Sequence, residues 1–307
     1  MGKASRTKTD SNRRERIAAA RAAERRRQQR QRLLIAGGGI LAVIVIVVGF
    51  VIFKGATSNP NNIAGSASNG PTGTSLTTVV NEVTNVPAST LDQVGAGGAK
   101  LSGGIKSVSG ESPLTANGKP EVFFDGAEYC PYCGANRWGL IVALSRFGTF
   151  TGLKTIHSST SDSPSDVPTW TFYGSKYTSN YITFTPVEET GNVADSSGQY
   201  PTLQTPTTAQ ANLLTKLDPG TNGEGGPIPF VDFGNKYTQI GDLGMLQPSN
   251  LSGNWEKIAG DLSQPSTSNA KAVDGAANFM TAAICKLTNN QPATACTSTV
   301  QSLESQL

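Results

Sequence analysis

One long uncharged segment, Leu33 to Phe53, divides the sequence and limits what the chain can fold into. Its 21 residues contain no charge and no proline, and as an α-helix they reach about 31 Å, which matches the hydrocarbon core of a bilayer. A cleavable signal peptide is the alternative, but its apolar part is usually shorter, and no small-residue cleavage site stands before Lys54. We therefore expect an uncleaved transmembrane helix over residues 33–53.

The charges on the two sides of this segment have opposite balance. Residues 1–32 hold 12 Lys or Arg and three acidic residues, a net charge of +9, whereas residues 55–307 hold 12 Lys or Arg and 19 acidic residues, a net charge of −7. The positive-inside rule places residues 1–32 in the cytoplasm as a basic tail and the C-terminal part outside, in a single-pass protein of the cell membrane. No aromatic residues are interleaved in this tail for base stacking, so we expect no nucleic-acid partner.

The part beyond the membrane segment divides into a linker and a folded domain. Residues 54–85 are rich in Gly, Ser, Asn, Thr and Pro, a composition typical of a flexible linker. Residues 86–307 are long enough to bury a core of their own. All four cysteines lie in this exported domain, where disulfides persist. A single histidine, His157, excludes His-rich metal sites and catalysis that needs two imidazoles.

The motif with the clearest chemistry is Cys130-Pro-Tyr-Cys133. The residues before it, 121–125 (EVFFD), read as a buried strand, and an apolar helical pattern follows as far as Phe147. The N-terminus of a helix stabilises a thiolate through its unpaired N–H groups and its positive dipole end. This lowers the thiol pKa and predicts Cys130 as a nucleophile. Cys133, one turn further along, is placed to resolve a mixed disulfide formed on Cys130.

Two other interpretations of the CxxC motif remain open at this point, a zinc half-site and a structural bridge. Zinc would also have to recruit Cys285 and Cys296, whose ten-residue spacer is not typical of zinc ligands, so we expect no metal and no cofactor. These two cysteines fall in helical segments on either side of a break at residues 289–292. We expect a structural disulfide between Cys285 and Cys296; a second redox pair that relays electrons is the alternative.

A second unit, residues 228–233 (IPFVDF), places a proline immediately before an apolar strand. Together, the strand–CxxC–helix unit and this proline–strand unit resemble the thioredoxin superfamily; CPYC also resembles the motif of glutaredoxins, and CPxC that of DsbA-type oxidases. The resemblance implies a cis peptide bond at Pro229, in a loop beside the CxxC motif. It also implies that Ile228, Pro229 and Tyr132 contact an extended substrate. Pro227 is the rival position for the cis-proline.

Over its exported part the chain resembles the membrane-anchored thioredoxin-like family known as domain of unknown function 929. This resemblance rests on three segments, GAEYCPYCGANRWGLIVALSRFG, IPFVDFGNKY and ICKLTNNQPATAC. The chain departs from thioredoxins in two ways. Phe124 stands where thioredoxins carry a buried acid, and strand parity sends Asp125 to the opposite face. The 95 residues between Cys133 and Pro229 are more than a minimal thioredoxin needs, so residues 158–224 are expected as a β-rich insertion. We expect this insertion to extend the sheet; shaping a substrate groove is the alternative.

The sequence thus predicts an α/β protein with a thioredoxin-like fold, a β-rich insertion and C-terminal helices, preceded by one transmembrane helix. The expected function is an extracytoplasmic thiol–disulfide oxidoreductase that acts on thiols or disulfides of exported proteins through Cys130 and Cys133. The resemblance implies a quinone-linked membrane reductase of the vitamin K epoxide reductase type as the recycling partner. Two alternatives remain, a redox-inert binding module and a structural subunit of an envelope membrane complex. Exposure of Cys130 beside Pro229 favours the enzyme, whereas burial of both sulfurs favours the alternatives.

Overall fold

The structure is a computed structural model that describes residues 68–98, 104–220 and 226–307. The chain divides into two units, residues 1–61 and residues 62–307, and every described residue belongs to the second. The expected basic tail and the expected transmembrane helix lie outside the described residues. Within the described ranges, no helix combines the length and the apolar character needed to cross a bilayer.

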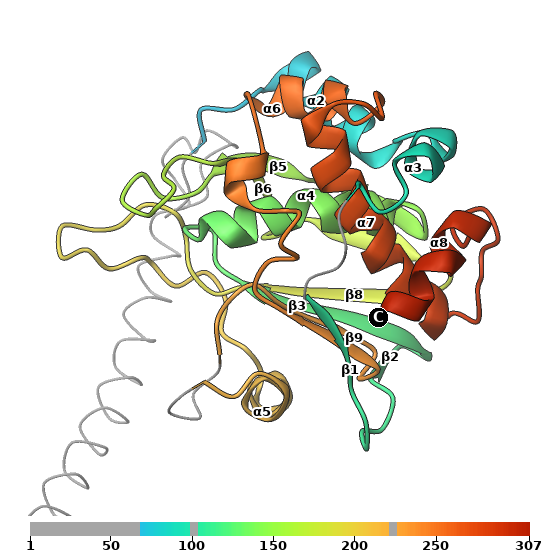
Figure 1. Ribbon diagram of the computed structural model, residues 1–307. Helices are drawn as coiled ribbons and strands as arrows, with labels where there is room; N and C mark the ends of the chain where they lie inside the picture. Colours follow the sequence, from blue (N-terminus) through green and yellow to red (C-terminus); the bar gives the residue numbers. More distant parts are fainter. Residues whose placement is uncertain (1–67, 99–103, 221–225) are drawn as a thin grey trace, which may run out of the picture. The chain divides into compact units, whose positions relative to one another are not determined.

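A mixed α/β domain is built around one central sheet, which confirms the expected α/β class (Figure 1). The described residues contribute six strands to it: β1 (Ile105–Ser107), β2 (Thr115–Ala116), β3 (Lys119–Gly126), β8 (Thr183–Glu188), β9 (Phe230–Phe233) and β10 (Tyr237–Ile240). β3 lies in the middle, parallel to β8 and antiparallel to β9. β10 pairs with β9 and β1 pairs with β10, while β2 forms a hairpin with the start of β3.

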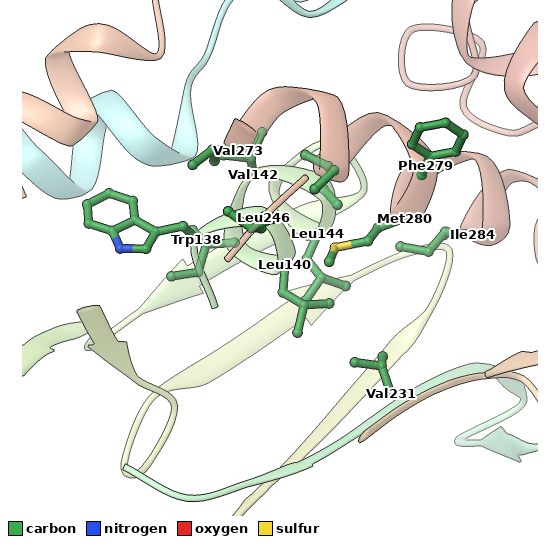
Figure 2. Packing of buried hydrophobic residues seen from close by; sticks show 14 of the residues in the cluster. Trp138, Leu140, Val142, Leu144, Val231, Leu246, Val273, Phe279, Met280 and Ile284 are labelled. Carbon is green, nitrogen blue, oxygen red and sulfur yellow. The ribbon is translucent and has the colours of Figure 1, made fainter. Parts of the chain in front are cut away.

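The helix α4 (Pro131–Ser145) connects the parallel strands β3 and β8 and is buried on nearly every side. It lies between the sheet and the long helix α7 (Ser268–Leu287), and these two helices pack directly against each other. Figure 2 shows Val142 of α4 near Val273 of α7, and Leu140 toward Val231 of β9. A helix with neighbours on both sides has no solvent face to keep polar, and its sequence is accordingly apolar all round.

The second face of the central sheet is covered by α5 (Thr208–Leu217), whose Leu214 packs with Phe123 and Phe230 (Figure 1). Because successive strand residues point to opposite faces, Phe123 faces α5 while Phe124 faces α4. Both faces of β3 are therefore covered, which accounts for the apolar run Val122-Phe123-Phe124 that identified this strand in the sequence.

The remaining elements lie around this framework. Two further two-stranded sheets pair β4 (Gly148–Thr151) with β7 (Lys176–Ser179) and β5 (Lys154–His157) with β6 (Pro168–Thr171). The other helices among the described residues are α2 (Gly73–Thr84), α3 (Ala88–Val94), α6 (Trp255–Asp261), α8 (Ser298–Leu303) and two 3₁₀ turns, Pro248–Asn250 and Glu304–Gln306. α2 packs on α6 and α4, and α8 packs on α7.

The fold corrects one expectation about domain organisation and adds detail to another. The flexible linker expected over residues 54–85 is wrong for its last part, because residues 73–84 form α2 and bury Val79 and Val83. Within residues 158–224, expected as a β-rich insertion, residues 183–188 form β8, the parallel partner of β3, so this part of the segment extends the central sheet. Two parallel strands need a crossover connection, and α4 lies in the crossover that leads from β3 to β8. β8 pairs with the edge of β3 that β9 leaves free.

Candidate functional site

Cys130 stands at the point where β3 has ended and α4 begins. It is the N-cap residue of α4, and its Sγ accepts a hydrogen bond of 3.2 Å from the backbone N–H of Cys133. Pro131 occupies the first helical position, where a backbone donor is not required. A thiolate at this place is stabilised by the free N–H groups and by the positive end of the helix dipole.

The two thiols of the motif differ in burial and in acidity. Both are free thiols and both are buried, with 6% of Cys130 and 0% of Cys133 exposed. The hydrogen bond from the Cys133 side chain, acting against burial, holds the pKa of the Cys130 thiol below its ordinary value. Burial raises the pKa of the Cys133 thiol well above its ordinary value. Cys130 therefore has the properties of the nucleophile, and Cys133 those of a neutral thiol that donates to it.

The proline loop lies against Cys130. The peptide bond between Ile228 and Pro229 is cis, whereas Pro227 is not preceded by a cis bond. The carbonyl oxygen of Ile228 is 3.9 Å from Cys130 Sγ. The carboxylate of Asp218, at the end of α5, accepts a hydrogen bond from the backbone N–H of Gly226 and so ties α5 to the start of this loop.

The three residues implied as substrate contacts are exposed to different degrees. Tyr132 is 38% exposed, Ile228 is half-buried and Pro229 is buried. Only Tyr132 therefore presents a large surface to solvent, while Ile228 offers its carbonyl at the sulfur. Tyr129, directly before Cys130, stacks on Tyr200 with ring centroids 4.5 Å apart.

A buried ion pair that the sequence reasoning missed lies behind the cysteines. Arg137 of α4 and Glu188 of β8 are both 0% exposed. Arg137 Nε donates to Glu188 Oε1 over 2.8 Å, and Nη2 donates to Glu188 Oε2 over 2.6 Å and to the carbonyl oxygen of Ala127 over 2.8 Å. The available signal was Arg137 itself, the only charged residue within α4, because a charge in a fully buried helix requires a partner.

The side of the sheet that faces α4 carries Phe124 of β3, an apolar side chain. Phe124 belongs to the same apolar cluster as Cys133. Asp125 is 4% exposed, and burial first and neighbouring carboxylates second raise its pKa to about 8. Its register opposite Phe230 places it on the α5 face, away from the cysteines, as strand parity predicted.

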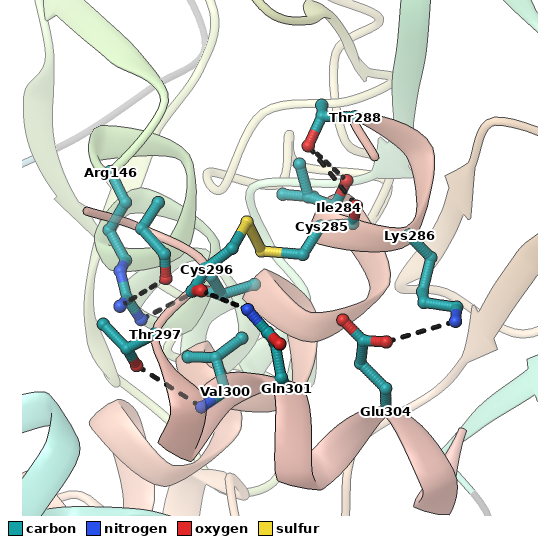
Figure 3. The surroundings of a disulfide bond; sticks show 12 residues. Arg146, Ile284, Cys285, Lys286, Thr288, Cys296, Thr297, Val300, Gln301 and Glu304 are labelled. Carbon is teal, nitrogen blue, oxygen red and sulfur yellow. Dashed lines mark hydrogen bonds and ion pairs between the residues drawn. A yellow bond between two sulfur atoms is a disulfide. The ribbon is translucent and has the colours of Figure 1, made fainter. Parts of the chain in front are cut away.

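The second pair of cysteines lies at the far end of α7. Cys285 and Cys296 form a disulfide with their Cα atoms 5.8 Å apart (Figure 3). Arg146, at the end of α4, donates to the carbonyl oxygen of Ala295 over 2.7 Å, next to this bridge. The described residues contain no group of three or more side chains arranged to hold a metal ion.

Residues 107–206 match the family described as "Domain of unknown function (DUF929)". The match covers about a third of the chain, and residues 107–206 are called the DUF929 segment below. No curated protein and no solved structure matches the chain significantly.

The DUF929 segment contains one half of the candidate site. It includes β3, both cysteines of the CxxC motif, Arg137 and Glu188. The proline loop and the Cys285–Cys296 bridge lie beyond its end at residue 206, and the chain fold brings the loop back to the DUF929 segment at Cys130. The assembled site holds one acidic thiol, one neutral thiol and a backbone carbonyl at the sulfur. These groups are suited to exchanging disulfide bonds.

Proposed function

We propose that this protein is a thiol–disulfide oxidoreductase that exchanges disulfides with exported proteins through Cys130 and Cys133. The observation that carries the proposal is the position of Cys130 Sγ. It caps the N-terminus of α4, accepts the N–H of Cys133 and lies 3.9 Å from the carbonyl that precedes cis-Pro229. The hydrogen bonds from Cys133 help to lower the pKa of the Cys130 thiol, and the Ile228 carbonyl places the backbone of the proline loop beside its sulfur.

We further propose that the domain is thioredoxin-like. The support is the order of its elements: strand β3, the CxxC motif, helix α4, parallel strand β8, helix α5, a cis-proline, the β9–β10 hairpin and helix α7. β9 and β10 extend the sheet on the side of β3 opposite β8. The helices α4 and α7 cover one face and α5 covers the other.

In the reduced protein, the exchange begins at Cys130. The Cys130 thiolate attacks one sulfur of a substrate disulfide, the substrate S–S bond breaks, and the first substrate thiol leaves with a proton. Cys133 then loses its proton, attacks the Cys130 sulfur and releases the second substrate thiol. The substrate gains two electrons and two protons, and the protein is left with a Cys130–Cys133 disulfide. The reverse sequence oxidises a substrate dithiol.

The proposed location is the outer side of the cell membrane, with residues 33–53 as anchor. The uncharged segment, the basic residues before it and the disulfide at Cys285–Cys296 support this location. A quinone-linked membrane reductase is the proposed recycling partner. Protease added to intact cells or spheroplasts should digest the domain beyond Lys54, and protection of that domain would contradict the orientation.

The burial of both sulfurs favours a second candidate function, a redox-inert binding module. Only 6% of Cys130 is exposed, so its sulfur offers little surface for the attack on a substrate disulfide. In the inert module, the CxxC pair would have only a structural role.

Trapping the half-reaction separates these two functions. Cys133→Ala removes the resolving thiol and keeps the nucleophile, so mixed disulfides with exported proteins should accumulate and appear on a non-reducing gel after acid quenching. Cys130→Ala is the matched control and should show none. Pro229→Thr should prolong the same adducts. If Cys133→Ala forms no reducible adducts and the wild-type pair resists dithiothreitol in the native state, the inert module is the better account.

A further inference from the structure

We infer that the buried Arg137–Glu188 pair makes the Cys130–Cys133 disulfide an electron acceptor, so that its substrates are reduced cysteine pairs of exported polypeptides. The inference rests on the proposed oxidoreductase function and adds the direction of electron flow. Arg137 acts here as a positioning residue, because it reaches the chemistry through its charge.

The guanidinium of Arg137 is held in one place. Its three hydrogen bonds, two to the carboxylate of Glu188 and one to the carbonyl of Ala127, span 2.6–2.8 Å. Glu188 Oε1 also accepts the backbone N–H of Phe172 over 3.2 Å. Burial alone would lower the pKa of Arg137, but the carboxylate raises it above its ordinary value, so the group stays charged.

The side chain of Arg137 extends toward the cysteines. Arg137 follows Cys133 by one helical turn on α4, and long helical side chains point back toward the N-terminus of their helix. Its Cζ lies 5.8 Å from the ring centroid of Phe124. A Cβ atom added to Gly126 would lie 2.6 Å from Phe124 Cζ and 3.3 Å from Cys133 Sγ, so the ring and the sulfur are neighbours. The guanidinium, the ring and the CxxC motif form one packed group.

The cation is not fully satisfied by its partners. Arg137 Nη1 is buried and has no hydrogen-bond acceptor among the described residues. The positive charge of Arg137 lowers the pKa of both Cys130 and Cys133, behind the larger contributions of hydrogen bonding and burial. Arg137 therefore presents a fixed positive charge on the side of the two cysteines where the neighbouring residue of β3, Phe124, carries no charge.

This charge affects the two redox states unequally. The reduced pair can carry a thiolate on Cys130, which a nearby cation stabilises, whereas the disulfide carries no charge and gains nothing. A dithiol whose reduced form is stabilised has a higher reduction potential and acts as an oxidant. The position of Arg137 therefore favours transfer of electrons from the substrate thiols to the Cys130–Cys133 disulfide.

The resulting reaction starts from the oxidised protein. A substrate thiolate attacks the sulfur of Cys130, the Cys130–Cys133 bond breaks, and Cys133 leaves and takes a proton. The second substrate thiolate attacks the substrate sulfur of this mixed disulfide and releases Cys130 as a thiolate. The substrate loses two electrons and gains a disulfide, and the pair gains the two electrons. An external disulfide or a quinone-linked partner accepts them when the pair is reoxidised.

The test compares variants that change the local charge in opposite directions. Arg137→Met with Glu188→Met removes the whole pair, and apolar replacement of a buried ion pair is often neutral for stability. Glu188→Gln keeps the cation and removes its counter-charge. Arg146→Met is the matched control, because Arg146 is a half-buried arginine at the other end of α4 from the CxxC motif, where it bonds Asn278 and Ala295.

Two quantities are measured on each folded variant, the equilibrium of the 130–133 pair with glutathione and the pH dependence of Cys130 alkylation. Removing the Arg137–Glu188 ion pair should lower the equilibrium constant with which the Cys130–Cys133 disulfide oxidises glutathione about tenfold. This is about 30 mV for a two-electron couple, and the Cys130 pKa should rise. Glu188→Gln should change both quantities in the opposite direction, and Arg146→Met should change neither.

The outcomes separate this inference from the proposed function. If the variants titrate like the wild type, or if both Arg137 and Glu188 changes move the equilibrium the same way, the ion pair is structural and the inference is wrong. If the double variant does not fold, the direction of the Glu188→Gln shift still decides. If the wild-type pair does not exchange with glutathione at all, the proposed oxidoreductase function itself fails.

Discussion

Removal of the Cys285–Cys296 bridge should weaken the fold and leave the chemistry at Cys130 unchanged. The two cysteines are 11 residues apart, and closing a loop of that length in the unfolded chain corresponds to about 2.8 kcal/mol of unfolding free energy at 25 °C. Both side chains are buried, at 0% and 2% exposed, so Ala at these positions adds a small packing loss. The bridge joins the end of α7 to the start of α8.

The assay is thermal unfolding of the Cys285→Ala/Cys296→Ala variant, followed by circular dichroism. A loss of that size should lower the melting temperature by roughly 6–11 °C in a domain of this length. Cys130→Ala/Cys133→Ala is the matched control, because it removes two buried sulfurs without opening a bridge. If the bridge variant melts like the wild type but loses disulfide exchange, the pair is an electron relay and the reasoning is refuted.

Two further predictions concern buried groups. Burial raises the pKa of Asp274 to about 8 from an ordinary value of 3.8; the folded state therefore binds its proton more tightly, and stability falls as pH rises between these values. Asp274→Asn should flatten that fall in denaturant titrations at several pH values, whereas the exposed Asp195→Asn should not; an unchanged slope would contradict the assignment. Gly126→Ala would place a Cβ 2.6 Å from Phe124 and should cost about 1–3 kcal/mol by overpacking. Gly260→Ala, with no atom within 4 Å of the added Cβ, is its control, and equal stability of the two variants would count against this packing.

The local part of the site is readable from the sequence. EVFF identifies a strand covered on both faces, and Cys130-Pro131 marks the start of a helix whose apolar residues continue to α4's end. These features depend on residues close together in the chain, where periodicity and capping preferences act. The disulfide partners and the proline before β9 are likewise visible as residue types at suggestive spacings.

The missed features depend on contacts between distant residues. Arg137 and Glu188 are 51 residues apart, and nothing local to either indicates the other. β8 reads as one more strand of an insertion until its parallel pairing with β3 is known. The helix at residues 73–84 was not predicted because its composition is mostly polar. Only a narrow apolar stripe, which includes Val79 and Val83, indicates the face that packs against the domain.

The central claim is that Cys130 and Cys133 form a redox-active pair. It is tested most directly by equilibrating the wild-type domain with glutathione buffers of increasing oxidation, quenching with acid and counting free thiols by alkylation and mass spectrometry. The account predicts a reversible two-electron transition confined to residues 130 and 133, with Cys285–Cys296 oxidised throughout. A 130–133 pair that stays in one state across the whole range while the protein remains folded would contradict it.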